Sequence, residues 1–170
     1  MSRNRSGLLH LSISWVKGAV MTEELVILVS QELQDLGSDL PKSFCKLFLR
    51  RLEALGCPVT EEEESFALAF AARKTEVEIL DYCHIDLIPA VLYPLLCDRA
   101  AGRYLYDRKQ MGKLEVDTLD LSGAFSSLTE GDMTVSFSSG TSDSEKLDQL
   151  LQMMMASGKE QLKCYRKVKF

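Results

Sequence analysis

The segment from Thr60 to Tyr82 constrains the fold most, because it has helical spacing and is apolar on more than one face. A helix that is apolar around much of its circumference needs neighbours on several sides. Thr60 and Glu63 form a capping-box pattern at its start. The apolar positions are Phe66, Leu68, Phe70, Ile79 and Leu80. The sequence therefore predicts a central, buried helix within a bundle.

Two shorter segments that precede this helix also have helical spacing. The first runs from Thr22, a candidate cap, to Leu36, and Gly37 is its expected stop. The second has Pro41 in its first turn and ends at Gly56. Their apolar stripes are Leu25, Val29, Leu33 and Leu36, and then Phe44, Phe48, Leu52 and Leu55. Each stripe has the spacing of a helix with one apolar face.

Two further helices are expected after the central one. The fourth extends from about His84 to Gln110, with Pro89 in its first turn. Pro94 lies a turn further in and is expected to kink that helix, because proline lacks a backbone donor. The last helix covers 142–158, where Ser142 and Glu145 make a second capping box. Its apolar stripe is Leu147, Leu150, Leu151 and Met154.

Between these last two helices the pattern changes from helical to alternating. Residues 111–131 are loop-like, and residues 132–138 alternate apolar with polar side chains, as in a half-buried strand. A lone strand or hairpin is marginally stable and leaves an edge that invites pairing. Three partners stay open for it: residues 114–121, residues 165–170, or another chain. The side chains expected to contact another chain are Glu130, Asp132, Met133, Val135 and Phe137.

The predicted fold is mainly α: a small bundle of four to five helices with a loop, strand or hairpin arm and an extended C-terminal tail. Its parts are a helical core at 21–110, the arm at 111–141, a C-terminal helix at 142–158 and a basic tail at 159–170. Residues 1–20 are unlike the rest. They fit a start at Met21 or a disordered arm better than a signal peptide, because Ser12, Ser14 and Lys17 break the apolar centre.

Charge is unevenly distributed along the chain, whose net charge is −5. Residues 1–20 carry only basic charges, the tail at 159–170 has five bases against one acid, and the body between them is acidic. An acidic body argues against general nucleic-acid binding, which needs a basic face. The five cysteines lack a C-x-x-C spacing and favour a reducing compartment. No apolar run is long enough to span a membrane.

No catalytic or metal-binding motif stands out. Cys83 and His84 are adjacent near Asp86, which leaves a nucleophile or metal ligand open. A buried structural cysteine beside a capping histidine explains the pair better. The glutamates at 61–64 are typical of a helix start, where the dipole favours acids. We expect no enzyme, no metal site and no cofactor.

The order of these parts resembles head–tail connector, or adaptor, proteins of long-tailed phages and prophages. The resemblance rests on Arg51–Tyr106, with its "LG" turn and "ILDYC" helix end, on "LTEGDMTVSF" at Leu128–Phe137 and on the terminal "CYRKVKF". It covers about two-thirds of the chain. Residues 1–40 and Pro94 depart from the family pattern.

This resemblance implies a ring-forming structural protein of the virion neck, assembled in the host bacterial cytoplasm. The ring would be dodecameric to match the portal, and would join the portal to the stopper or tail-completion protein. Genomic DNA would pass through its channel without sequence-specific binding. The expected portal contact is the tail, with Lys163, Tyr165, Arg166, Lys167, Lys169 and Phe170.

A small helical DNA-packaging accessory or DNA-binding protein is the alternative function. Such a protein needs a basic helix face that neutralises phosphates. The helices at 60–106 offer only scattered bases, namely Arg73, Lys74, Arg99 and Arg103. The connector is therefore the better hypothesis.

Overall fold

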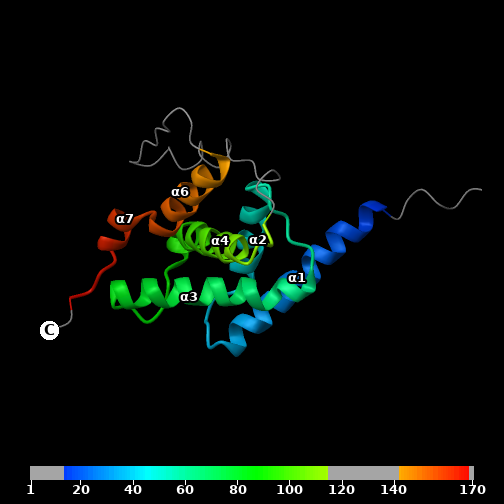
Figure 1. Ribbon diagram of the computed structural model, residues 1–170. Coiled ribbons are helices and arrows are strands. Elements are labelled where there is room, and N and C mark those ends of the chain that lie inside the picture. The colour runs from blue at the N-terminus through cyan, green and yellow to red at the C-terminus, as the bar shows by residue number, and fades with distance from the viewer. Residues whose placement is uncertain (1–13, 115–141, 169–170) are drawn as a thin grey trace, which may run out of the picture.

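The central helix predicted from the sequence is α3 (Ser65–Cys83). The computed structural model describes residues 14–114 and 142–168, and within these ranges the chain is mainly helical with no strand. The other elements are α1 (Ser14–Asp35), α2 (Lys42–Ala54), η1 (Glu62–Glu64), η2 (Ala90–Leu92), α4 (Tyr93–Gln110), α6 (Asp143–Ala156) and α7 (Lys159–Lys163). The predicted small helical bundle is confirmed (Figure 1).

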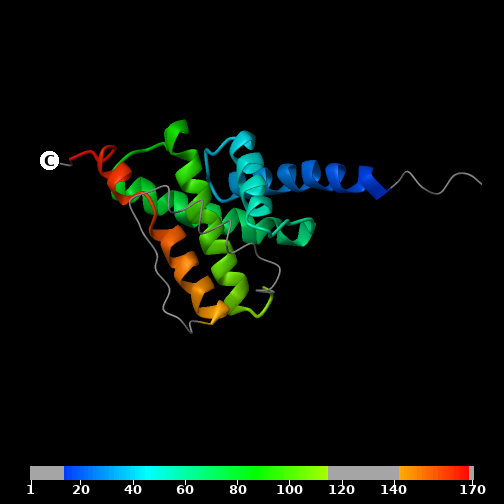
Figure 2. The ribbon, with the colours of Figure 1, turned by 90° about the horizontal axis from the view of Figure 1, so that it is seen from above.

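The core lies where α3 packs between α1 and α4. α2 packs on α1 and α4, α6 packs along α4, and α7 reaches the C-terminal end of α3 (Figures 1 and 2). The stripes predicted for the first two helices are buried at Leu25, Val29, Leu33, Phe44, Phe48 and Leu52. Burial of these side chains is the main force that holds the helices together.

α3 is less buried than predicted. Leu68, Ala72 and Ile79 are fully buried, but Phe66 and Phe70 are 53% and 47% exposed. The prediction that all apolar positions of this helix lie inside is therefore wrong for the two phenylalanines. The reason is geometric: α1 and α4 cover one side of α3, and no described element covers the side that carries these rings.

The start of this helix also differs from prediction, because Thr60 does not cap it. Residues 62–64 form a 3-10 turn, and neither η1 nor α3 has a side-chain cap. The carboxylate of Glu64 turns inward and pairs with Arg108 of α4 at 2.7 Å. The second capping box is confirmed: Glu145 N–H donates to the Ser142 hydroxyl, and Ser142 N–H donates to the Glu145 carboxylate. The Ser142 N–H and the Ser142 hydroxyl both donate to the Glu145 carboxylate and lower the pKa of Glu145.

Pro94 does not kink the fourth helix, because α4 begins at Tyr93 and puts this proline in its first turn. A first-turn residue has no intrahelical partner for its N–H, so proline costs nothing there. Pro89 instead precedes the 3-10 turn η2. The residues from 84 to 89, predicted to be helical, form the connection from α3.

Both ends of the described chain differ from the predicted boundaries. α1 begins at Ser14, so Thr22 lies inside the helix and does not cap it. The tail expected to be extended from Lys159 starts instead with the short helix α7, after Gly158 reverses the chain at φ +66°. The arm predicted around 132–138 lies outside the described residues. Among the helices that are described, none combines the length and apolar character needed to cross a bilayer.

Gly102 lets α4 and α6 approach each other closely, and this contact gives a test of the packing. A Cβ atom at this position would lie 2.8 Å from Met154 Cβ and 3.2 Å from the Leu151 carbonyl oxygen. Neither neighbour can rotate away. Gly102→Ala should therefore lower the free energy of unfolding by about 1–3 kcal/mol, although alanine normally stabilises a helix interior.

Urea denaturation followed by circular dichroism measures this change. Asp107→Ala, at an exposed position of the same helix, is the control and should stay near the wild-type value. A Gly102→Ala variant more stable than wild type would contradict the close approach.

Candidate functional site

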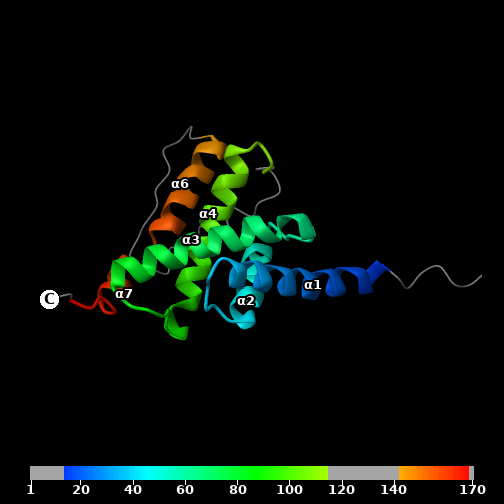
Figure 3. The same cartoon turned by 90° about the horizontal axis from the view of Figure 1, so that it is seen from below.

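The C-terminal tail is fastened to the end of α3. Lys167 N–H donates to the Cys83 carbonyl at 2.8 Å, and the Arg166 guanidinium lies 5.5 Å from the centre of the Tyr82 ring. Cys83 Sγ also approaches the Leu162 carbonyl at 3.5 Å. The figures show the C-terminus leaving the molecule at this end of α3 (Figures 1 and 3). The basic tail therefore has a defined position on the bundle.

His84 creates the acceptor that the tail uses. It adopts a left-handed conformation at φ 53° and ends α3, with its N–H donating to the Leu80 carbonyl. Helices commonly end in this way, and their last carbonyls then lack intrahelical partners. The Cys83 carbonyl is one of these, and Lys167 satisfies it. The expected capping histidine beside a buried cysteine is thus confirmed.

The structure places four of the six predicted tail residues. Arg166 and Lys167 are exposed, while Tyr165 is half-buried against the core. Lys163 is exposed but paired with Glu160 at 2.5 Å, which raises its pKa. Lys169 and Phe170 lie outside the described residues. Among the four described residues, Arg166 and Lys167 are therefore the exposed bases that no ion pair within the described chain engages.

Exposed apolar side chains at this end were missed by the sequence analysis. Leu87 and Val91, in the connection after α3 and in η2, are 62% and 59% exposed, and Val168 in the tail is 74% exposed. Leu87 and Val91 were assigned to the fourth helix, where apolar residues are usually core. The position of Pro94 is the signal that could have placed the helix start after them.

The predicted contacts of the arm with another subunit or neck protein are outside the part of the chain that the structure describes. Glu130, Asp132, Met133, Val135 and Phe137 all lie outside the described residues. Their proposed role in pairing with another chain stays a prediction.

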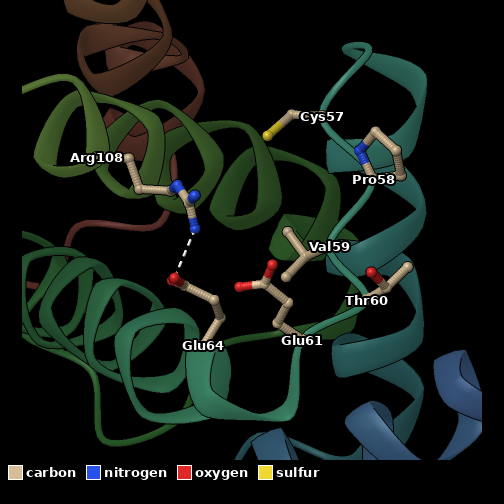
Figure 4. A pocket seen from close by; sticks show the side chains of 7 residues that line it. All are labelled: Cys57, Pro58, Val59, Thr60, Glu61, Glu64 and Arg108. Carbon is tan, nitrogen blue, oxygen red and sulfur yellow. Dashed lines mark ion pairs between the residues drawn. The ribbon is translucent and has the colours of Figure 1, made fainter. Parts of the chain in front are cut away.

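A small hollow lies at the other end of α3, beside the turn that follows α2. Its lining is Cys57, Pro58, Val59, Thr60, Glu61, Glu64 and Arg108 (Figure 4). The Glu64 carboxylate accepts a hydrogen bond from the Tyr104 hydroxyl at 3.2 Å, in addition to the ion pair with Arg108. Arg108 also donates to Tyr104 and to the Lys113 carbonyl, both at 3.1 Å.

This network joins α4 to the start of α3 and pairs Glu64 with Arg108, two of the three charged residues that line the hollow. Burial raises the pKa of the Tyr104 hydroxyl, which keeps it a neutral donor to Glu64. Burial likewise raises the pKa of the Cys57 thiol, the opposite of what a nucleophilic cysteine needs. The arrangement is a structural clamp between two helices.

Cys83 has the environment of a core cysteine. Its side chain is fully buried, and burial raises the pKa of its thiol. Within residues 14–114 and 142–168, no group of three or more His, Cys, Asp or Glu residues is arranged to hold a metal ion. The geometry at Cys83 therefore suits packing and a contact with Leu162, and gives no support to a nucleophile.

Comparison of the chain with models of protein families, with curated proteins and with solved structures finds no match. The residues themselves and the resemblance described above are therefore the basis for assigning a function.

Thiol accessibility provides a direct test of the cysteine environments. Ellman's reagent at neutral pH should react quickly with Cys164, which is exposed, and slowly with half-buried Cys57. Cys45, Cys83 and Cys97 are buried, with raised thiol pKa values, and should react only on unfolding.

The Cys164→Ser variant should lose the fast phase, which identifies that thiol. Rapid modification of Cys83 in the folded protein, located by peptide mass spectrometry, would reopen the possibility of a reactive thiol.

Proposed function

We propose that this chain is a head–tail connector protein that forms a ring below the portal of a long-tailed phage or prophage. The proposal adds the resemblance of Arg51–Tyr106 to the architecture of that segment, which comprises the end of α2, all of α3 and most of α4. The "ILDYC" pattern closes α3, and its cysteine and tyrosine both contact the C-terminal tail. Two parts of the family pattern that are distant in sequence therefore meet in space.

The fastened basic tail is the observation that carries the proposal. A connector has to present a fixed surface to the portal, and an ordered tail loses less conformational entropy on binding than a free one. Arg166 and Lys167 supply positive charge, and Leu87, Val91 and Val168 supply exposed apolar area at the same end of α3. We expect the portal to offer an acidic surface with apolar side chains there.

The DNA-binding alternative receives less support. Three of the four bases named for a phosphate-binding face are engaged within the bundle, and the fourth, Lys74, is exposed. Arg73 pairs with Glu76 at 2.9 Å, Arg103 pairs with Glu78 at 2.6 Å, and Arg99 donates to the Ser157 carbonyl. An acidic body around a channel would instead repel phosphates, so that DNA moves through without sticking.

Portal docking is the first test of this function. Replacing Lys163, Arg166, Lys167 and Lys169 by glutamate should abolish co-migration with the portal protein of the same virion, because like charges repel at the contact. Light scattering or electron microscopy of the chain with and without portal measures the complex. Arg50→Glu/Lys113→Glu changes two exposed charges elsewhere and should leave docking intact. Unchanged docking of the tail variant would refute its role.

The arm at 130–137 gives an independent test. Changing Met133, Val135 and Phe137 to serine removes the apolar face of the expected strand, and ring or neck assembly should fail. The helical bundle should keep its circular dichroism spectrum, since none of the three belongs to a described helix. Normal assembly of this variant would contradict pairing between chains.

A further inference from the structure

The N-terminal end of α3 carries an exposed aromatic pair on an acidic background. The rings of Phe66 and Phe70 lie 5.9 Å apart and nearly parallel, and they are 53% and 47% exposed. Glu62 and Glu63, one turn earlier, are also exposed. We call these four residues the acidic phenylalanine surface. Contiguous exposed aromatic side chains are typical of interfaces, whereas single exposed apolar residues are common anywhere.

The charges of this surface are available to a partner. Glu64, the next acid along the chain, is used by Arg108 within the bundle. In the described part of the chain, no ion pair involves Glu62 or Glu63. A fitting partner therefore has basic side chains alternating with apolar ones.

The C-terminal tail of this same chain has that chemistry. Arg166 and Lys167 are exposed and precede Val168, which is 74% exposed. Acid and phenylalanine at one end of α3 therefore match base and apolar side chain at the other end. The outward face between them continues with Val77, which is 37% exposed.

A chain cannot make this contact with itself. α3 has 19 residues, which corresponds to a length of about 28 Å. Lys167 is held at the Cys83 carbonyl and Arg166 lies over the Tyr82 ring, so both bases of the contact stay at the C-terminal end of α3. The tail and η1 lie at opposite ends of α3 (Figures 1 and 3).

We propose that the acidic phenylalanine surface binds the C-terminal tail of a second copy of this chain. The contact is heterologous, because each copy uses a different surface on its two sides. Repetition of such a contact gives a closed ring when the rotation between copies allows it, and a filament otherwise. The inference rests on the proposed function in one respect: a connector ring needs a repeating contact of this kind.

In this arrangement the tail makes the contact between copies that forms the ring, and the ring then docks on the portal. Glutamates in the tail disrupt portal docking in this arrangement as well, because the ring that docks is lost. Variants of the acidic phenylalanine surface separate the two uses of the tail. If the tail contacts only the portal, these variants leave its binding unchanged. If the tail binds the neighbouring copy, these variants release it from that copy.

A reciprocal charge exchange in the purified full chain tests the contact. Variant A is Arg166→Glu/Lys167→Glu, and variant B is Glu62→Lys/Glu63→Lys. Each alone sets like charges against each other, and self-association should weaken by about tenfold or more relative to wild type. An equal mixture of A and B should associate again, because each tail then meets a surface of opposite charge. Sedimentation velocity at low salt measures all of these, since salt screens exposed charges.

Two control variants separate this contact from general effects. Asp35→Lys/Asp39→Lys makes the same change of charge at exposed positions around the α1–α2 turn, and should associate as wild type does. Phe66→Ser/Phe70→Ser should weaken association and leave the bundle folded, with a modestly lower urea midpoint because each ring is about half buried. Circular dichroism establishes that every variant is folded before it is compared.

Three results would overturn the inference: a wild-type chain that stays monomeric up to about 1 mM, a variant B that associates normally, or a mixture of A and B that does not recover. Portal docking is measured separately, as co-migration with the portal protein. Recovery in the mixture without portal docking would leave the head-to-tail contact standing and refute the connector function.

Discussion

Small side chains on the inner face of α3 are the constraint on which the bundle depends. Ala69, Ala71 and Ala72 are buried there beside Leu68 and Ile79. They allow α1 and α4 to pack closely against α3. Because these alanines bring the backbones close together, larger side chains at these positions would separate all three helices. α1, α4 and α7 all contact α3. The C-terminal tail and the acidic phenylalanine surface lie at its two ends.

α3 has the apolar pattern of a central helix, but part of its surface is exposed. The sequence could place α1, α2, α4 and α6, because each has one apolar stripe and a terminating glycine, proline or cap. It could not separate the inner face of α3 from Phe66 and Phe70, because periodicity counts apolar positions without knowing which sides have neighbours. The excess of apolar residues was real, and part of it lies on the surface of α3.

The predicted start of α3 was wrong for a related reason. Thr60 and Glu63 have the spacing of a capping box, but a long-range ion pair between Glu64 and Arg108 fixes the first turn instead. Local patterns cannot reveal a partner that lies 44 residues away in the chain. The tail contact at Cys83 is similar: a left-handed His84 and a donor at Lys167 meet only in the folded chain. The basic character of the tail was readable, whereas its attachment point was not.

The corner between α6 and α7 fixes the direction in which the tail leaves. Arg99 of α4 donates two hydrogen bonds to the Ser157 carbonyl, at 2.8 and 2.6 Å, and Gly158 lies so close to Leu95 that a Cβ atom there would overlap its side chain. These contacts with α4 therefore set the direction of the tail. The same helix holds the start of α3 through Arg108. One residue added to α6 would rotate everything beyond it by about 100° and misalign the tail with its acceptor. The length of α6 therefore determines the direction in which the tail leaves the molecule.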